Sequence, residues 1–121
     1  MTATAGVDAD VDVNVPAGQS ARFVVIYDTP SDVYAFECHY NDVHLPLARQ
    51  YPGLRRYTRS HKPEVVIGEP CYAVMMLDWD DMAALEAALG SEIGQRVAAD
   101  AMANLARYAS FRGMIMQLEE V

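Results

Sequence analysis

The chain has 121 residues, and 52% of them are hydrophobic, which is enough to build the core of a single domain without a metal or a crosslink. A formal net charge of −8 opposes binding to nucleic acid phosphates and to anionic membrane surfaces. No stretch is apolar over the roughly 18 residues that a membrane-spanning helix needs, and the N-terminus lacks a signal-peptide pattern, so we expect a cytoplasmic protein.

Cysteine and histidine spacing gives no sign of a metal site. Cys38 and Cys71 stand alone in the sequence, and we expect both to be buried free thiols. The three histidines lack an H-E-x-x-H motif or a comparable ligand spacing. We therefore expect no protein-bound metal and no cofactor.

Residues 1–20 are small, polar and acidic, and we expect a flexible arm ahead of one domain at 21–121. The alternation of apolar residues from Val7 to Val15 leaves a strand docked on a partner as the alternative.

The first half of the domain reads as a strand followed by a helix. Residues 23–27 are β-branched and aromatic, which predicts a central strand. Ser31 or Asp32 then caps a helix whose apolar residues recur at three- and four-residue spacing. Pro46 has no N–H to donate to the carbonyl of Asp42, so we expect this helix to kink or end there.

The second half contains three more strands and a helix in two pieces. Two-residue alternation predicts an exposed or half-buried strand at 54–61. Apolar runs predict two further strands, at 71–77 and 111–118. Helical spacing covers 82–89 and 91–107, and we expect Gly90 to separate the pieces in the left-handed conformation.

This order of strand, helix, strand, strand, helix, strand predicts an α+β fold of the ferredoxin-like split βαβ type (βαββαβ). In it a four-stranded antiparallel sheet carries its helices on one face. The first and third strands are apolar on both faces, so the second sheet face also needs a cover. We expect that cover to be a second copy of the chain, in a homodimer.

Motifs along residues 22–119 occur in an informative combination: the strand 23–27, Phe36-Glu-x-x-Tyr40 with His44-Leu-Pro, Pro52-Gly-Leu-Arg-Arg-Tyr57, Leu77-Asp-Trp79 and the helix 90–100. Together they resemble the EthD-like family. The resemblance implies a dimeric α+β barrel, in which two subunits face their sheets together and each keeps a small-molecule cavity between sheet and helices. Activities on this scaffold include lactone isomerisation, polyketide cyclisation and cofactor-free oxygenation, and EthD itself is associated with bacterial degradation of fuel ethers.

His44 is the main candidate for catalysis, because an imidazole titrates near working pH and the Pro46 kink could turn it towards a pocket. The alternative is a histidine that donates a hydrogen bond to a freed carbonyl. Tyr57 is the second candidate, since relatives carry a pocket tyrosine at this spacing whose phenol could polarise a substrate carbonyl; ordinary packing is its alternative. Lactone isomerases have a cysteine where this chain has Leu77, which argues against muconolactone isomerase chemistry.

An aromatic lining is expected around these two residues, because ligand pockets are mostly apolar. The expected lining residues are Tyr27, Tyr40, Trp79 and Phe111. For each of them the alternative is that it only fills the core. Arg59 could anchor a carboxylate or lie in solvent. Asp100, in an Ala-rich helix, is either exposed or paired with a partner such as an Arg, a Tyr hydroxyl or a strand N–H, and we favour a structural hydrogen bond.

The leading hypothesis is a cytoplasmic homodimer that acts without a cofactor on a small hydrophobic or aromatic molecule in catabolism or secondary metabolism. Its chemistry would be proton transfer by His44, giving isomerisation or cyclisation. The alternatives are a non-catalytic binding or accessory module for an oxygenase and a cofactor-free monooxygenase. Haem handling is a third possibility, on the presence of Asn41, His44 and Trp79.

Overall fold

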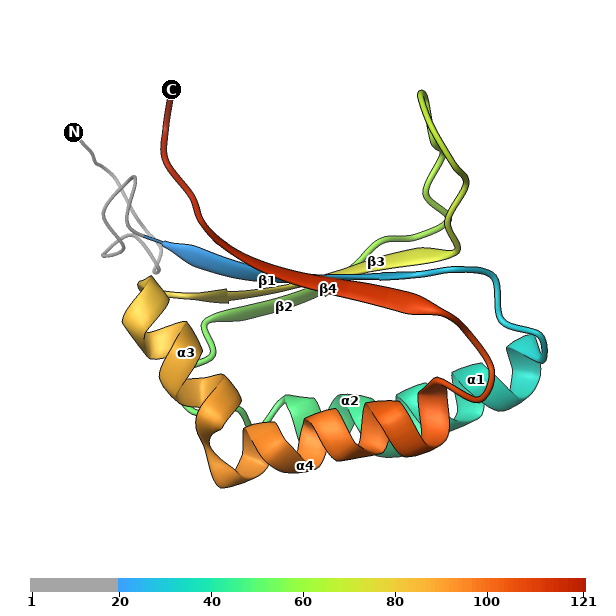
Figure 1. The fold of residues 1–121 in the computed structure, drawn as a ribbon, viewed down its shortest axis with the longest axis horizontal. Coiled ribbons are helices and arrows are strands. Elements are labelled where there is room, and N and C mark those ends of the chain that lie inside the picture. Colours follow the sequence, from blue (N-terminus) through green and yellow to red (C-terminus); the bar gives the residue numbers. More distant parts are fainter. Residues whose placement is uncertain (1–19) are drawn as a thin grey trace.

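The computed structural model describes residues 20–121, which form one sheet packed on a layer of helices (Figure 1). The order of strands and helices confirms the predicted ferredoxin-like α+β fold. In chain order the elements are β1 (Ala21–Tyr27), α1 (Val33–His39), the π-helical η2 (Tyr40–His44), α2 (Leu45–Ala48), β2 (Arg56–Arg59), β3 (Ala73–Trp79), α3 (Met82–Gly90), α4 (Glu92–Asp100), the π-helical η3 (Ala101–Leu105) and β4 (Phe111–Gln117). Residues 1–19 of the arm predicted at 1–20 lie outside the described residues.

The sheet is antiparallel throughout, in the order β2-β3-β1-β4. Val25, at the centre of β1, pairs with Met75 of β3 and with Gly113 of β4. Side chains alternate between the two faces of each strand. On β3 the inward residues Met75 and Leu77 are buried against the helices, whereas Val74, Met76 and Asp78, which alternate with the inward residues, are only half-buried.

The first helix continues through Pro46, so the predicted alternative in which it ends there is wrong. Its last turn before Pro46 is a wider, π-helical turn. Asp32 caps the start, its Oδ1 accepting from the N–H of Ala35 at 3.0 Å. At the other end of η2 the N–H of Leu45 donates to the carbonyl of Tyr40, one residue further back than in an α-helix. Pro46 then occupies the first turn of α2, where a missing N–H costs nothing.

The second helix is broken at Ser91 rather than by a left-handed glycine. Gly90 is the last residue of α3, and Gly53 and Gly68 are the glycines with positive φ in the described chain. Ser91 is extended (φ −70°, ψ 168°), and its hydroxyl accepts from the N–H of Gly94 at 3.0 Å to start α4. The expectation for Gly90 was therefore wrong, because an extended Ser91 both ends one piece and caps the next.

The sheet face opposite the helices has no covering layer among residues 20–121 (Figure 1). Strand alternation places a set of half-buried or exposed apolar side chains on this outer face, namely Val24, Ile26, Val74, Met76 and Met114. The loop 60–72 rises over the same side, and Val66 and Ile67 within it are 92% and 91% exposed. An apolar face with apolar residues projecting beside it is typical of a protein–protein contact.

Candidate functional site

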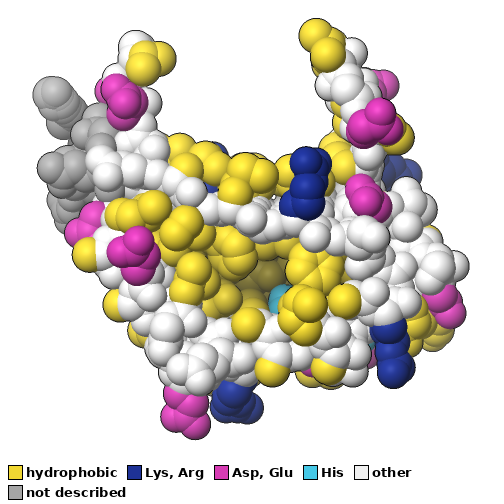
Figure 2. Space-filling model, in the orientation of Figure 1, with side chains coloured by type: hydrophobic (Ala, Val, Ile, Leu, Met, Phe, Trp, Pro, Cys, Tyr) yellow, Lys and Arg dark blue, Asp and Glu magenta, His cyan; other side chains and the backbone are white. Residues whose placement is uncertain are grey.

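A cavity of about 300 Å³ lies between the inner face of the sheet and the helix layer. Figure 2 shows its mouth as a hollow rimmed by hydrophobic side chains, with a histidine visible inside. The lining holds no Lys, Arg, Asp or Glu side chain and consists of Phe23, Val25, Tyr27, His44, Tyr51, Leu89, Gly94, Val97, Ala98, Ala101, Met102 and Phe111. The site can therefore bury an apolar molecule next to one imidazole.

A smaller void adjoins this cavity on the side of β2 and β3. It shares His44 and Tyr27 with the cavity and is lined in addition by Tyr40, Tyr57 and Met75. Of the predicted catalytic pair, His44 lines both spaces and Tyr57 lines the smaller one.

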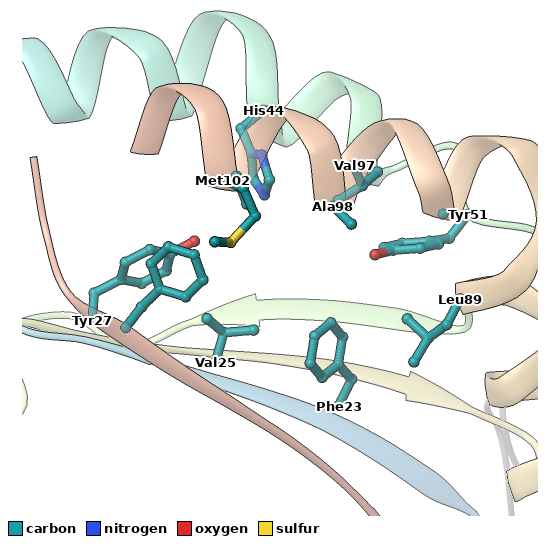
Figure 3. Close-up of a pocket in the computed structure, with 12 residues that line it drawn as sticks. Phe23, Val25, Tyr27, His44, Tyr51, Leu89, Val97, Ala98 and Met102 are labelled. Carbon is teal, nitrogen blue, oxygen red and sulfur yellow. The ribbon is translucent and has the colours of Figure 1, made fainter. Parts of the chain in front are cut away.

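His44 is the only polar or charged residue that is buried in the described chain, with 6% of its surface exposed. Its Nδ1 lies 2.9 Å from Oδ2 of Asp100. An ionised carboxylate can only accept, so this bond places the proton of the neutral ring on Nδ1 and leaves Nε2 as an acceptor. In Figure 3 the ring extends from the helix layer into the cavity, between Met102 and Ala98.

Asp100 accepts from three side chains. Besides His44, Nε2 of His39 lies 2.8 Å from Oδ1 of Asp100, and Nδ2 of Asn104 donates to the same oxygen at 2.8 Å. Burial alone would raise the pKa of Asp100, but the hydrogen bonds from Asn104, His44 and His39 together lower it. The carboxylate is therefore ionised and fixed in place.

Burial lowers the pKa of His44, and this effect outweighs the opposite pull of the Asp100 carboxylate. The ring is consequently neutral at neutral pH, which is the state that a general base requires. The Asp100–His44 pair has the same arrangement as the orienting carboxylate and base of a catalytic triad.

The π-helical segments explain how two histidines reach one carboxylate. In an α-helix, residues five apart point in directions about 140° apart, so His39 and His44 would diverge. Across the wider turn of η2, closed by the bond from Leu45 to Tyr40, they lie one turn apart on the same side. Asp100 directly precedes η3. Single π-turns inside α-helices are frequent at functional sites.

Four buried or half-buried tyrosines surround the imidazole. Burial raises the pKa of Tyr27 and of Tyr40 far above the ordinary value, and it raises the pKa of Tyr51 to about 12. Burial also raises the pKa of Tyr57, although its hydrogen bond with Tyr40 opposes this. All four phenols therefore keep their protons at neutral pH and can act as hydrogen-bond donors.

The structure brings together most of the residues singled out from the sequence. His44, Tyr27 and Phe111 line the cavity, and Tyr40 and Tyr57 line the adjoining void.

Two of the expected ligand-binding residues lie elsewhere. Trp79 lines neither space, and its Nε1 donates to the carbonyl of Pro52 at 2.9 Å within the core. Arg59 forms a 2.5 Å ion pair with Glu37, and its guanidinium lies 5.3 Å from the centre of the Tyr40 ring.

Sequence reasoning missed the partners of Asp100 and the contribution of Tyr51. Asp100 makes hydrogen bonds as expected, but its partners are two histidines and Asn104, none of which was among the examples considered, an Arg, a Tyr hydroxyl or a strand N–H. The signal that could have revealed this is Pro46, because the N–H that it lacks favours a wide turn that aligns His39 with His44.

Three observations bear on other functions. Cys38 and Cys71 are free, and both are half-buried rather than fully buried as expected. Within residues 20–121 no group of three His, Cys, Asp or Glu side chains is arranged to hold a metal ion. The same part of the chain contains no helix with the length and hydrophobicity needed to span a membrane.

Comparison with known proteins places this geometry in a family. Residues 29–107 match the family model of the EthD domain. An uncharacterised 11.0 kDa protein encoded in the thcB–thcC intergenic region of Rhodococcus erythropolis is 36% identical over 87 residues, which cover 70% of this chain and 82% of that protein.

Solved structures agree with the family match. An EthD family protein from Bacillus halodurans is 29% identical and superposes with a TM-score of 0.70, covering 84% of this chain and 99% of that one. SnoaB, a cofactor-independent oxygenase from Streptomyces nogalater, shares the fold at 16% identity with a TM-score of 0.61 over 85% of this chain and 96% of that one. A dimeric ferredoxin-like protein from Thermobifida fusca shares it at 14% identity with a TM-score of 0.60, over 87% and 97% of the two chains.

Proposed function

The chain belongs to the EthD family, and from this premise we propose that it catalyses a cofactor-independent proton transfer on a small hydrophobic or aromatic molecule. The reaction class would be isomerisation or cyclisation, in catabolism or secondary metabolism. The observation that carries the proposal is the bond from Nδ1 of His44 to Asp100, which leaves Nε2 free beside an apolar cavity. A base held in this way needs no metal or nucleotide to remove a proton next to a carbonyl group.

In the proposed mechanism Nε2 of His44 accepts a proton from a substrate carbon next to a carbonyl. The imidazolium that forms keeps its Nδ1 bond to Asp100, whose negative charge stabilises it. The imidazolium then returns the proton to a different carbon, which completes an isomerisation. Alternatively, the carbanion attacks a second carbonyl of the same molecule, and the alkoxide that forms takes the proton back from the imidazolium, which completes a ring closure. The cavity is open at its mouth (Figure 2), so the imidazolium can exchange its proton with solvent before it returns one to the substrate.

The negative charge that develops on the substrate oxygen requires a donor, and we propose Tyr57 for this role. The hydroxyls of Tyr40 and Tyr57 lie 2.6 Å apart, and either can donate to the other. When Tyr40 donates, the proton of Tyr57 remains available for a substrate oxygen that reaches the adjoining void. A donor that already accepts a hydrogen bond is polarised and donates more strongly.

The cavity supports an uncharged substrate. Its lining has no cationic side chain that could pair with a carboxylate, and Arg59 is already bound to Glu37. Tyr27 and Phe111 would contact an aromatic or alicyclic ring at the sheet side of the cavity. A volume of about 300 Å³ is at the lower end of the range for small-molecule sites, so we expect a molecule of one or two rings.

We further propose that the chain works as a cytoplasmic homodimer built on the outer face of the sheet. The bare apolar face and the exposed Val66 and Ile67 support this assembly. The Thermobifida fusca protein of the same fold is described as dimeric, which adds to this support. The cavity lies on the opposite face of the sheet, so each protomer would keep its own site.

Two alternatives remain open to the same cavity. A non-catalytic binding or accessory module would use the apolar lining alone and leave the proton on the ligand. A cofactor-free monooxygenase would use His44 to deprotonate an electron-rich phenol that then reacts with oxygen itself, and the fold shared with SnoaB favours this candidate over other oxygenases.

The proposal is tested by incubating the protein in heavy water with a panel of neutral ring ketones, 1,3-diketones, lactones and phenols. Proton NMR then reports exchange of carbon-bound hydrogen, calorimetry reports affinity, and an oxygen electrode reports oxygen uptake. The proposal predicts exchange with at least one ketone or diketone and no oxygen uptake. Affinity without exchange would replace it with the binding module, and oxygen uptake with a phenol would replace it with the monooxygenase.

A further inference from the structure

His39 occupies the outer side of the carboxylate that orients the proposed base. Its Nε2 contacts both oxygens of Asp100, at 2.8 and 3.0 Å, whereas His44 contacts Oδ2 from the cavity side at 2.9 Å. The side chains differ in depth, since that of His39 is 22% exposed, that of Asp100 is 10% exposed and that of His44 is 8% exposed. The three groups thus form a chain from the surface to the cavity.

One carboxylate can compensate the charge of one imidazolium but not of two. When this network binds a single proton, that proton can reside on either ring. The ring nearer to water has the smaller cost of carrying the charge, because burial penalises the charged form of a group. A proton on His39 also repels a second proton from His44, since the two rings share the same counter-charge.

We propose that His39 is a positioning residue that acts on His44 through Asp100. His39 keeps the Asp100 carboxylate oriented towards His44. It also takes up the proton that the group of His39, Asp100 and His44 binds, so that His44 stays neutral with Nε2 open to the cavity. The consequence for catalysis rests on the proposed function, but the assignment of the proton does not. His39 has no contact with the cavity and is therefore not itself a catalytic residue.

The other groups that face His44 do not disturb this assignment. The ring of Tyr40 lies 5.5 Å from that of His44, and Tyr27 and Tyr51 line the same cavity. These phenols are neutral at neutral pH, because burial raises the pKa of each of them. Among the described residues, Asp100 is the charged group that is hydrogen-bonded to His44.

The test uses the full chain labelled with ¹⁵N at histidine and follows the ring nitrogens by NMR as the pH is lowered. In the wild type, His44 is expected to show the Nδ1–H tautomer and to remain neutral after His39 has become charged. In His39→Gln the amide can still donate to Asp100 but cannot take up a proton. His44 is then expected to become charged at a pH about one unit higher, the size of shift that marks strongly coupled sites.

His39→Phe, which removes both the hydrogen bond and the proton site, is expected in addition to reduce the population of the Nδ1–H tautomer. A wild-type His44 that becomes charged before His39, or an unchanged titration of His44 in His39→Gln, would overturn the proposal. Should His39→Gln fail to fold, the order in which the two wild-type rings become charged decides the question alone. No substrate is involved, so failure of the exchange assay leaves this result intact.

Discussion

The hydroxyl oxygens of Tyr40 and Tyr57 lie 2.6 Å apart and join the helix layer to the edge strand β2. Tyr40 is 1% exposed, so its hydroxyl has no access to bulk water. Each phenol therefore supplies the partner that the other needs in the interior. The bond holds the same helical segment that carries His44.

We predict that Tyr57→Phe lowers the free energy of unfolding by about 1 to 3 kcal/mol, because it leaves the buried hydroxyl of Tyr40 without a partner. The double variant Tyr40→Phe/Tyr57→Phe should cost less than the sum of the two single variants, since it removes both polar groups at once. Urea denaturation of the four proteins measures the cycle. Strictly additive costs would show that the two hydroxyls do not depend on each other.

A second prediction concerns Gly94, at the junction of α3 and α4. A Cβ atom at this position would lie 2.3 Å from the carbonyl oxygens of Ala88 and Leu89, which is far inside van der Waals contact. Gly94→Ala should therefore lower the free energy of unfolding by about 1 to 3 kcal/mol and displace the cavity wall that Gly94 forms.

Gly90→Ala is the matched control for Gly94, because a Cβ atom there would meet nothing within 4 Å and the residue has no positive φ. It should leave stability unchanged or raise it by about 0.4 to 1 kcal/mol. Equal losses in the two variants would contradict a steric requirement specific to Gly94.

A third prediction is that His44 makes the protein less stable in acid. Because burial lowers its pKa, the folded ring binds a proton less readily than the unfolded one. The contribution of the neutral ring is fully present above the unfolded value of about 6.5 and is lost as the pH falls through the interval down to the lowered folded value. The pKa of Asp100 is lowered as well, so it acts with the same sign at a lower pH, around and below about 3.9.

His44→Gln should therefore flatten the decline in the free energy of unfolding between about pH 7 and about pH 5. The control is His61→Gln, since His61 lies exposed in the loop 60–72. Denaturation at a series of pH values measures both slopes. A wild-type slope retained in His44→Gln would mean that the folded protein binds this proton as easily as the unfolded chain.

A fourth prediction addresses the outer face of the sheet. Met76 pairs with Val24 at the centre of this face, so Met76→Asp should place a charge in the proposed interface and convert a dimer into monomers. Tyr34→Asp is the control, because Tyr34 is 80% exposed on the helix side. Sedimentation equilibrium measures the assembly, and a wild-type monomer or a dimeric Met76→Asp variant would exclude this interface.

The loop 60–72 gives a milder test of the same interface. Val66→Ser/Ile67→Ser removes two exposed apolar side chains and should weaken the dimer without changing the stability of the protomer. Unchanged dimer affinity would confine the contact to the sheet itself.

The fold was largely predictable because its signals are local. The β-branched run 23–27, the helix cap expected at Ser31 or Asp32, and the apolar strand that includes Met75 and Leu77 each specify their own element. The order of the elements then leaves few arrangements of the sheet. The error fell at the junction of α3 and α4, where Gly90 permits more than one backbone path; at Pro46 the sequence left two outcomes open, and the helix does not end there.

The candidate site was predictable only in part, because its chemistry depends on pairs of residues that are distant in sequence. His44 and Tyr57 stood out through residue type and motif. The bond from His44 to Asp100 spans 56 residues and requires a π-turn that no local propensity specifies. Trp79 and Arg59 have residue types suited to ligand binding, but both bond to other parts of the protein. Trp79 donates to the carbonyl of Pro52, and Arg59 pairs with Glu37.

The central claim, that His44 moves a proton within the cavity, is tested most directly by comparing deuterium exchange in wild type and His44→Gln. The substrate is the ring compound that exchanges fastest in the panel. Glutamine can keep a hydrogen bond to Asp100 but cannot act as a base. We predict that the exchange rate falls by at least about 100-fold while affinity for the compound is retained. Exchange at the wild-type rate in His44→Gln would contradict the account.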